Sequence, residues 1–176
     1  MSKKKIILVE GKTEQHLLTH LNISEQLFCK ISRFNLWEND INKIIVQLTR
    51  GAIIYIIYDI DTLFSSNLNK QTIGERFINN INTLLTTYKR TIILLQQTHN
   101  FEDELAYACT SEKALLKEFN ACNRQEFKKQ FLTTRNPLDK LKKIKFNQSN
   151  LWTKEMAQEL AIFQKYQGSW KKLKKR

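Results

Sequence analysis

The chain places short apolar runs between longer segments in which apolar residues recur at helical spacing. Three runs lack the alternation of a half-buried strand, so they predict strands buried on both faces, at 6–9, 52–58 and 91–95. A further strand is predicted within 26–37, where apolar and polar residues nearly alternate. The helical patterns between these strands lie at 14–21, 41–50, 72–88 and 101–109.

Strands that alternate with helices predict an α/β fold, with three or four parallel strands, right-handed crossovers and helices on both faces of a short sheet. The polar segment 62–71 is predicted as a loop that acts as a mobile flap. Beyond residue 110 the pattern is helical and basic. We therefore expect a core at 1–110 and a helical extension at 111–176 that packs on it as one structural unit. Its predicted helices are 112–119, 123–131, 138–144 and 154–166, the last one capped by Thr153 and ended by Gly168.

Acidic residues stand where two of the buried runs end. Glu10 follows the first run, and Asp59 and Asp61 follow the run at 52–58. Residues two apart in a strand project to the same side, so Asp59 and Asp61 can point together. Ligands collect at the carboxyl ends of parallel strands, and Mg²⁺ takes carboxylate oxygens. Singly, each acid is explained as a cap or a partner of Lys12 or Arg50, but together the three favour a metal site.

These two stretches resemble the Toprim domain, the metal-dependent catalytic module of topoisomerases, bacterial primases and several nucleases. The resemblance rests on VEGKTE at 9–14 and on the DxD pattern DID at 59–61. It implies a Rossmann-like three-layer core in which Glu10 is the acid/base group and Asp59 and Asp61 bind Mg²⁺ or Mn²⁺. Glu10 can alternatively bind a second metal. No glycine follows soon after the DxD pair, which favours the small nuclease-like members of the family.

A third acidic stretch, NFEDE at 100–104, follows the strand predicted at 91–95. Acids in a first helical turn suit the positive end of the helix, which accounts for much of the cluster without any function. In the functional interpretation, Glu102 or a neighbour faces Glu10 and completes the site. Small stand-alone Toprim nucleases of the RloB-like kind also carry a Phe-Glu pair here. Lys12 could neutralise transition-state charge, and His99 is either a proton shuttle or a structural hydrogen-bonding residue.

The 176 residues carry a formal net charge of +12, which implies attraction to polyanions and to nucleic acid first. Lysine dominates the last third of the chain. Trp170 either stacks on a base or anchors the chain end in the core, and the lysines are otherwise a solvated surface. The predicted nucleic-acid contacts are Lys128, Lys129, Lys142, Lys143, Trp170, Lys171 and Lys172.

The sequence therefore predicts a Mg²⁺- or Mn²⁺-dependent nuclease that cleaves DNA or RNA, tRNA included. Resemblance to defence-associated Toprim proteins suggests an antiphage effector with a regulatory protein partner, and a homo-oligomer stays open. The alternative is a non-enzymatic nucleic-acid-binding or regulatory subunit. Primase-like chemistry is disfavoured because the chain has neither a CxxC pair nor a P-loop. Three dispersed cysteines, no long apolar run and no signal-peptide pattern predict a cytoplasmic protein without a membrane partner.

Overall fold

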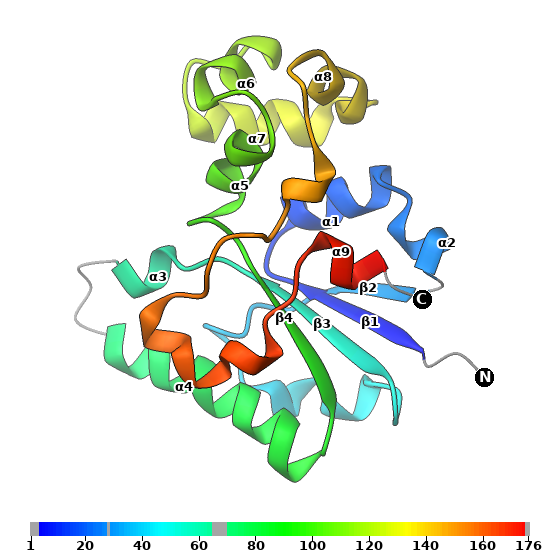
Figure 1. Cartoon of the computed structure of the whole chain (residues 1–176), viewed down its shortest axis with the longest axis vertical. Coiled ribbons are helices and arrows are strands. Elements are labelled where there is room, and N and C mark those ends of the chain that lie inside the picture. Colours follow the sequence, from blue (N-terminus) through cyan, green and yellow to red (C-terminus); the bar gives the residue numbers. More distant parts are fainter. Residues whose placement is uncertain (1–3, 28, 65–69, 175–176) are drawn as a thin grey trace.

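A four-stranded parallel sheet lies between two layers of helices (Figure 1). The structure is a computed structural model that describes residues 4–27, 29–64 and 70–174. The sheet order is β2-β1-β3-β4, with every neighbouring pair parallel. The predicted α/β class and parallel sheet are confirmed, as a Rossmann-like arrangement. The strands are β1 Lys5–Val9, β2 Cys29–Arg33, β3 Ile53–Tyr58 and β4 Thr91–Gln96.

Helices connect and cover the strands, and none in the described ranges is long and apolar enough to cross a membrane. The α-helices are α1 Lys12–His20, α2 Ile23–Leu27, α3 Asp61–Phe64, α4 Lys70–Asn82, α5 Phe101–Ala108, α6 Glu112–Glu118, α7 Arg124–Thr133, α8 Pro137–Lys143 and α9 Trp170–Lys174. The 3₁₀ turns are η1 Ile41–Lys43, η2 Ile45–Gln47, η4 Gln148–Asn150 and η5 Gln158–Tyr166, and the π-helical turn is η3 Thr83–Thr87.

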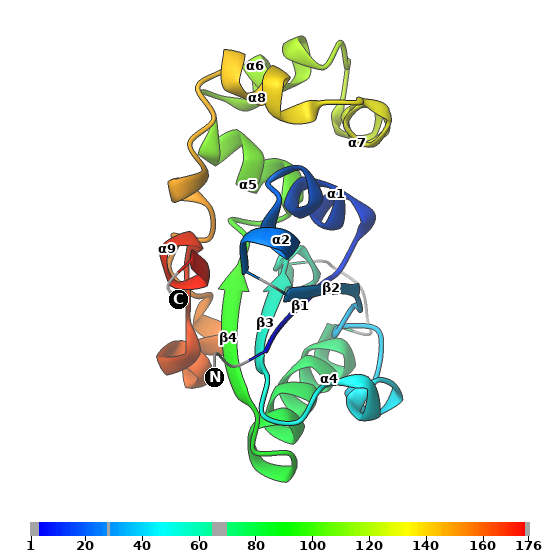
Figure 2. The same cartoon turned by 90° about the vertical axis from the view of Figure 1, so that its right-hand side faces the viewer.

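The apolar strand runs separate into two cores because successive strand residues face opposite sides of the sheet. Ile6 and Leu8 of β1 join the core beneath α4, η1, η2 and η5. Ile7 and Val9 join the core beneath α1, α5, α7 and α9. Burial on both faces explains why these runs do not alternate. Residues 111–173 contribute to both cores, and Figure 2 shows α5 to α8 beyond the carboxyl ends of the strands.

The helix predicted at 41–50 is wrong, because the segment forms η1 and η2 instead. Asn80, a buried residue of α4, supplies the reason. Its side-chain oxygen accepts the Ile41 N–H at 2.8 Å, and its amide donates to the carbonyls of Leu36 and Asn39, each at 2.8 Å. These contacts hold the backbone of residues 36–41 against α4, and Val46 in the following η2 is 88% exposed.

The helix predicted at 154–166 is confirmed in part, since Gln158–Tyr166 forms the 3₁₀ helix η5 whereas residues 154–157 before it are extended. It runs along the edge strand β4, where the Gly168 N–H donates to the Leu94 carbonyl at 2.7 Å. The Gln96 side chain accepts the Ala157 N–H at 2.9 Å and donates to the Glu155 carbonyl at 3.0 Å. Strand-edge contacts therefore replace helical ones, while the predicted inward residues of this segment are buried, namely Met156, Leu160 and Phe163.

Other differences concern the bounds of elements. The strand expected within 26–37 shortens to β2 and follows α2, which was not expected. The predicted helix 72–88 is α4 followed by the π-turn η3. The predicted flap begins as α3, and its residues 65–69 lie outside the described residues.

Gly168 provides a test of the packing along β4. A Cβ at this position would overlap Ile93 Cγ2 and would lie 2.9 Å from Leu95 Cδ2. We expect Gly168→Ala to lower the free energy of unfolding by about 1–3 kcal/mol, measured by urea denaturation. Gly74→Ala is the matched control, since nothing lies within 4 Å of its Cβ inside α4, and it should stabilise the protein by about 0.5–1 kcal/mol. Equal effects of both substitutions would contradict the close packing.

Candidate metal and catalytic site

The sheet order creates a topological switch point between β1 and β3. The chain leaves β1 for β2 on one side and later returns to place β3 on the other. Val9 pairs with Ile57, so Glu10 and Asp59 follow neighbouring strands where these end. Ligands of open parallel sheets bind at such a point, in the crevice outside the carboxyl ends of the strands. Two acids predicted from separate runs are therefore brought together.

Hydrogen bonds hold the backbone that carries Asp59. The Trp37 indole donates to the Asp59 carbonyl at 3.2 Å, and the next N–H, of Ile60, donates to the His99 carbonyl at 2.8 Å. Trp37 itself is buried, with its ring stacked on Phe77 at 4.0 Å between centroids. The carboxylate thus stands on backbone fixed from two other segments. The His99 ring stacks on Phe64 at 5.4 Å, at the end of α3.

Burial is the main electrostatic feature of the Glu10 and Asp59 carboxyl groups. It raises the pKa of Glu10 well above its ordinary value, and the charge of Asp59, a hydrogen bond to it and the charge of Glu14 raise this pKa further. Burial likewise raises the pKa of Asp59 to about 7, where the Glu10 hydrogen bond opposes and the Asp61 charge reinforces the increase. Like charges in a desolvated position favour retention of a proton.

Asp61, the third predicted ligand, lies at the first residue of α3 and is exposed. Its Oδ1 accepts the Thr62 hydroxyl at 3.4 Å. Its charge contributes to the raised pKa of Asp59, so the DxD pair shares one electrostatic environment. The two carboxylates nevertheless differ, since Asp59 is half-buried and Asp61 is exposed.

Glu14 is a member of the cluster that sequence reasoning did not assign to the site. It is 7% exposed, and its Oε2 accepts the Gly11 N–H at 3.1 Å and the Thr13 hydroxyl at 3.2 Å. Its Oε1 accepts the Gln97 amide at 3.3 Å. The signal for the first contacts was present, because an acid three residues after Gly11 is a capping-box pattern. Gln97, just after β4, has no comparable signal.

The acidic stretch that opens α5 divides into separate roles. Glu102 is 3% exposed, and its Oε2 lies 3.3 Å from the Lys128 ammonium of α7. Burial raises its pKa, the Lys128 charge opposes this, and the charge of Glu14 adds to it. Glu102 therefore lies near enough to Glu14 for the two charges to interact, and its predicted part in the site stays a prediction. Its neighbour Asp103 instead pairs with Arg124 at 2.7 Å.

Glu104, the last acid of the stretch, is structural. Its Oε2 accepts the Thr98 N–H at 2.6 Å and the Thr98 hydroxyl at 2.7 Å, and its Oε1 accepts the Trp152 N–H. Burial raises its pKa, and the bonds from Trp152 and Thr98 oppose the increase. This side chain ties the end of β4 to the returning C-terminal segment.

Three oxygens of the cluster are buried and have no hydrogen-bond partner among the residues that the structure describes. They are Oε1 of Glu10, Oε1 of Gln97 and Oε1 of Glu102. A buried acceptor without a donor costs about 1–3 kcal/mol, and a cation or its bound water would satisfy such oxygens. Within the ranges the structure describes, however, no three His, Cys, Asp or Glu side chains are already grouped closely enough to hold a metal ion.

The predicted cationic residues take several positions. Lys12 is exposed at the start of α1, and Lys129 is exposed on α7. Lys142 and Lys143 of α8 pair with Asp139 at 3.4 Å and Glu118 at 3.2 Å, which leaves Lys128 as the predicted contact that reaches the acidic cluster.

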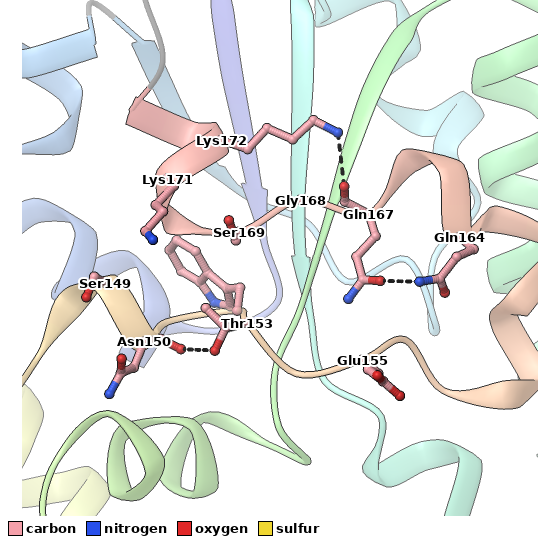
Figure 3. A pocket seen from close by; sticks show the side chains of 11 residues that line it. Ser149, Asn150, Thr153, Glu155, Gln164, Gln167, Gly168, Ser169, Lys171 and Lys172 are labelled. Atoms are coloured by element: carbon pink, nitrogen blue, oxygen red, sulfur yellow. Dashed lines mark hydrogen bonds between the residues drawn. The ribbon is translucent and has the colours of Figure 1, made fainter.

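Trp170 does not have the predicted role of stacking on a base. It is 4% exposed and packs against Trp152, with 5.8 Å between ring centroids, so it anchors the chain end in the core. Lys171 and Lys172 beside it line a cavity of about 760 Å³ (Figure 3). Lys172 already donates to the Gln167 carbonyl at 3.0 Å.

Comparison with known proteins gives no further assignment. No protein-family model matches the chain, and the searches of curated proteins and of solved structures give no match either.

The raised pKa of Asp59 makes stability depend on pH. At low pH the carboxyl is protonated in both states, and its ordinary pKa of 3.8 means that the unfolded chain ionises first as pH rises. The folded state keeps the proton up to about pH 7, so stability present at low pH is lost as pH rises through that value. In EDTA, we expect the free energy of unfolding of the wild-type protein to fall between about pH 5.5 and about pH 8 by about 2 kcal/mol more than that of Asp59→Asn.

The measurement is urea denaturation of both proteins at the two pH values. Glu159→Gln, which removes an exposed carboxylate of η5, serves as the control and should keep the wild-type slope. Parallel pH slopes for the wild-type protein and Asp59→Asn would show that Asp59 titrates normally.

Proposed function

We propose that the protein is a Mg²⁺- or Mn²⁺-dependent nuclease that hydrolyses phosphodiester bonds of DNA or RNA. The observation that supports this best is the pair Glu10 and Asp59 at the switch point of the sheet, both half-buried and each with a raised pKa, with a buried Glu10 oxygen that has no partner among the described residues. A structural acid would be expected to have its hydrogen bonds satisfied, as Glu104 does. Glu10 and Asp59 would instead be stabilised by a ligand that supplies positive charge.

The donor set fits a hard divalent cation. Glu10 and Asp59 would hold it, with Asp61 at the rim and the Gln97 and Glu102 oxygens available to the cation or its water. When bound, such a cation polarises a phosphate and stabilises the leaving oxygen. The donors are all oxygens, and this favours Mg²⁺ or Mn²⁺ over softer metals.

The chain itself would supply the proton transfer. In the alternative in which Glu10 does not ligate the cation, Glu10 would be the acid/base group, because burial makes it retain a proton more strongly than an ordinary glutamate. Lys12 lies two residues further along, exposed at the start of α1, where its charge would offset the negative charge of a reacting phosphate. Lys128 neutralises Glu102, the least accessible acid of the set.

The substrate class follows from charge. The chain carries 29 Lys and Arg against 17 Asp and Glu, so a polyanion is attracted despite the acidic cluster. Together with the Toprim resemblance of residues 9–14 and 59–61, this favours nucleic acid over a small phosphate ester. An antiphage role with a regulatory protein partner is part of the same proposal and rests on that resemblance alone.

The test is cleavage of plasmid DNA, single-stranded DNA and total tRNA by the purified chain with Mg²⁺ or Mn²⁺. We expect metal-dependent cutting that falls at least about 100-fold in Glu10→Gln and in Asp59→Asn. Glu159→Gln is the matched control and should cut normally. Binding of substrate without any cutting, unchanged in both site variants, would contradict the enzyme and favour a nucleic-acid-binding subunit.

A further inference from the structure

A second hollow lies at the edge of the sheet opposite the C-terminal segment. It has a volume of about 510 Å³ and follows β2, the edge strand that pairs only with β1 among the described strands. Cavities of about 300–1,000 Å³ hold ligands of nucleotide size. Its lining residues are Ile6, Gln15, Lys30, Ser32, Arg33, Ile44, Gln47 and Leu48, and we call this set the β2 groove.

The β2 groove combines cations and neutral donors with an apolar floor. Lys30 and Arg33 are both exposed, and neither side chain takes part in a hydrogen bond or ion pair within the described residues. Ile6 and Leu48 are 4% and 6% exposed and belong to the core, so only a small part of each side chain lines the groove. Phosphate oxygens fit the two cations, and the apolar floor offers a base a surface to lie on.

Sheet register connects the β2 groove to the acidic cluster. Arg33 pairs with Val9, the residue before Glu10, and the next N–H, of Phe34, donates to the Val9 carbonyl at 2.8 Å. Neighbouring strands lie about 4.8 Å apart, so the Arg33 backbone is one strand spacing from the start of the candidate site. Lys30 stands three residues earlier, beside Ile6. Lys30 and Arg33 therefore project toward opposite faces at the open edge of β2, and Arg33 is the cation that stands beside the end of β1.

We propose that the β2 groove binds the phosphodiester backbone of an unpaired nucleic-acid strand and leads it to Glu10 and Asp59. This rests on the proposed function for the choice of nucleic acid as the ligand. A hollow of this size admits single nucleotides, whereas a duplex is too wide to enter it. Edge lysines disfavour pairing with another protein strand, so Lys30 favours nucleic acid over a peptide as the occupant.

The structure also explains why this surface was not predicted from the sequence. The sequence predicted nucleic-acid contacts in the lysine-rich last third of the chain. In the structure, however, Trp170 is buried there, and Lys142, Lys143 and Lys172 have partners within the chain. Lys30 and Arg33 are only two charges, separated by Ile31 and Ser32. Their position next to Glu10 depends on the parallel pairing of β1 with β2, which no local pattern encodes.

The experiment measures binding of a short labelled single strand, as DNA and as RNA, by fluorescence anisotropy in EDTA across a salt series. We expect Lys30→Gln combined with Arg33→Gln to weaken binding about 10-fold or more at low salt. The slope of log affinity against log salt should flatten by about 1.4, because each lost phosphate contact removes about 0.7. Lys89→Gln combined with Lys113→Gln removes two exposed charges elsewhere and should leave the slope nearly unchanged.

Gln47→Lys keeps the test independent of folding, since it adds a cation to an exposed position of the same groove. It should tighten binding several-fold and steepen the slope by about 0.7. Unchanged affinity and slope in both groove variants would overturn the proposal. It would also be overturned if a duplex bound as tightly as the single strand and lost the same affinity in the groove variants. Binding is measured in EDTA, which prevents cleavage, so the result does not depend on nuclease activity. If the groove variants lose binding and the wild-type protein does not cut any substrate in the cleavage assay, the groove is supported and the nuclease is refuted.

Discussion

The structure depends on how a set of neighbouring buried and half-buried carboxylates is neutralised at the carboxyl ends of the strands. Glu10, Glu14, Asp59 and Glu102 lie close enough to affect one another's ionisation, and a like-charged cluster in a desolvated position is unstable unless charge is supplied. The chain provides part of this charge. Lys128 reaches Glu102, and the capping geometry of α1 holds Glu14, while Glu10 and Asp59 rely on a retained proton. A divalent cation would replace that proton.

The rest of the fold confines polarity to this position. Strands β1, β3 and β4 are apolar on both faces along most of their length, so the acids follow where β1 and β3 end, whereas the edge strand β2 carries Lys30, Ser32 and Arg33. The two edges of the sheet are treated differently. The C-terminal segment closes β4 through Gln167 and Gly168, whereas β2 borders an open groove with Lys30 and Arg33. A sheet closed at one edge and open at the other leaves a natural direction of approach for a substrate.

Sequence reasoning located Glu10 and Asp59 because each is an acid that ends an apolar run, a pattern that packing alone does not explain. It missed Gln97, since a glutamine after a strand is unremarkable until its amide is seen to bond Glu14. It also predicted continuous helices at 41–50 and 154–166, where the structure has shorter 3₁₀ segments. Those failures share a cause, because Asn80 in one case and Gln96 in the other satisfy backbone groups from distant parts of the chain. Such contacts cannot be seen in local periodicity.

Trp170 illustrates a different limit. Composition alone allowed it to stack on a base or to anchor the chain end, and only its packing against Trp152 decides for the anchor. Conversely, Arg33 had no distinguishing neighbours in the sequence and becomes notable through its register with Val9. The sequence shows which residues are acidic or basic, and the pairing of the strands determines which of them lie close enough to act on one ligand.

The most direct test of the central claim is to locate a cation in crystals of the protein soaked in Mn²⁺, by anomalous scattering. The carboxylate cluster should hold a Mn²⁺ peak in contact with Asp59 and Glu10, and this peak should disappear in Asp59→Asn crystals treated in the same way. The account would be contradicted by Mn²⁺ peaks found only away from Glu10 and Asp59, or by a peak at this site that persists in Asp59→Asn. The cluster would then be a structural feature whose charge is neutralised by protons alone.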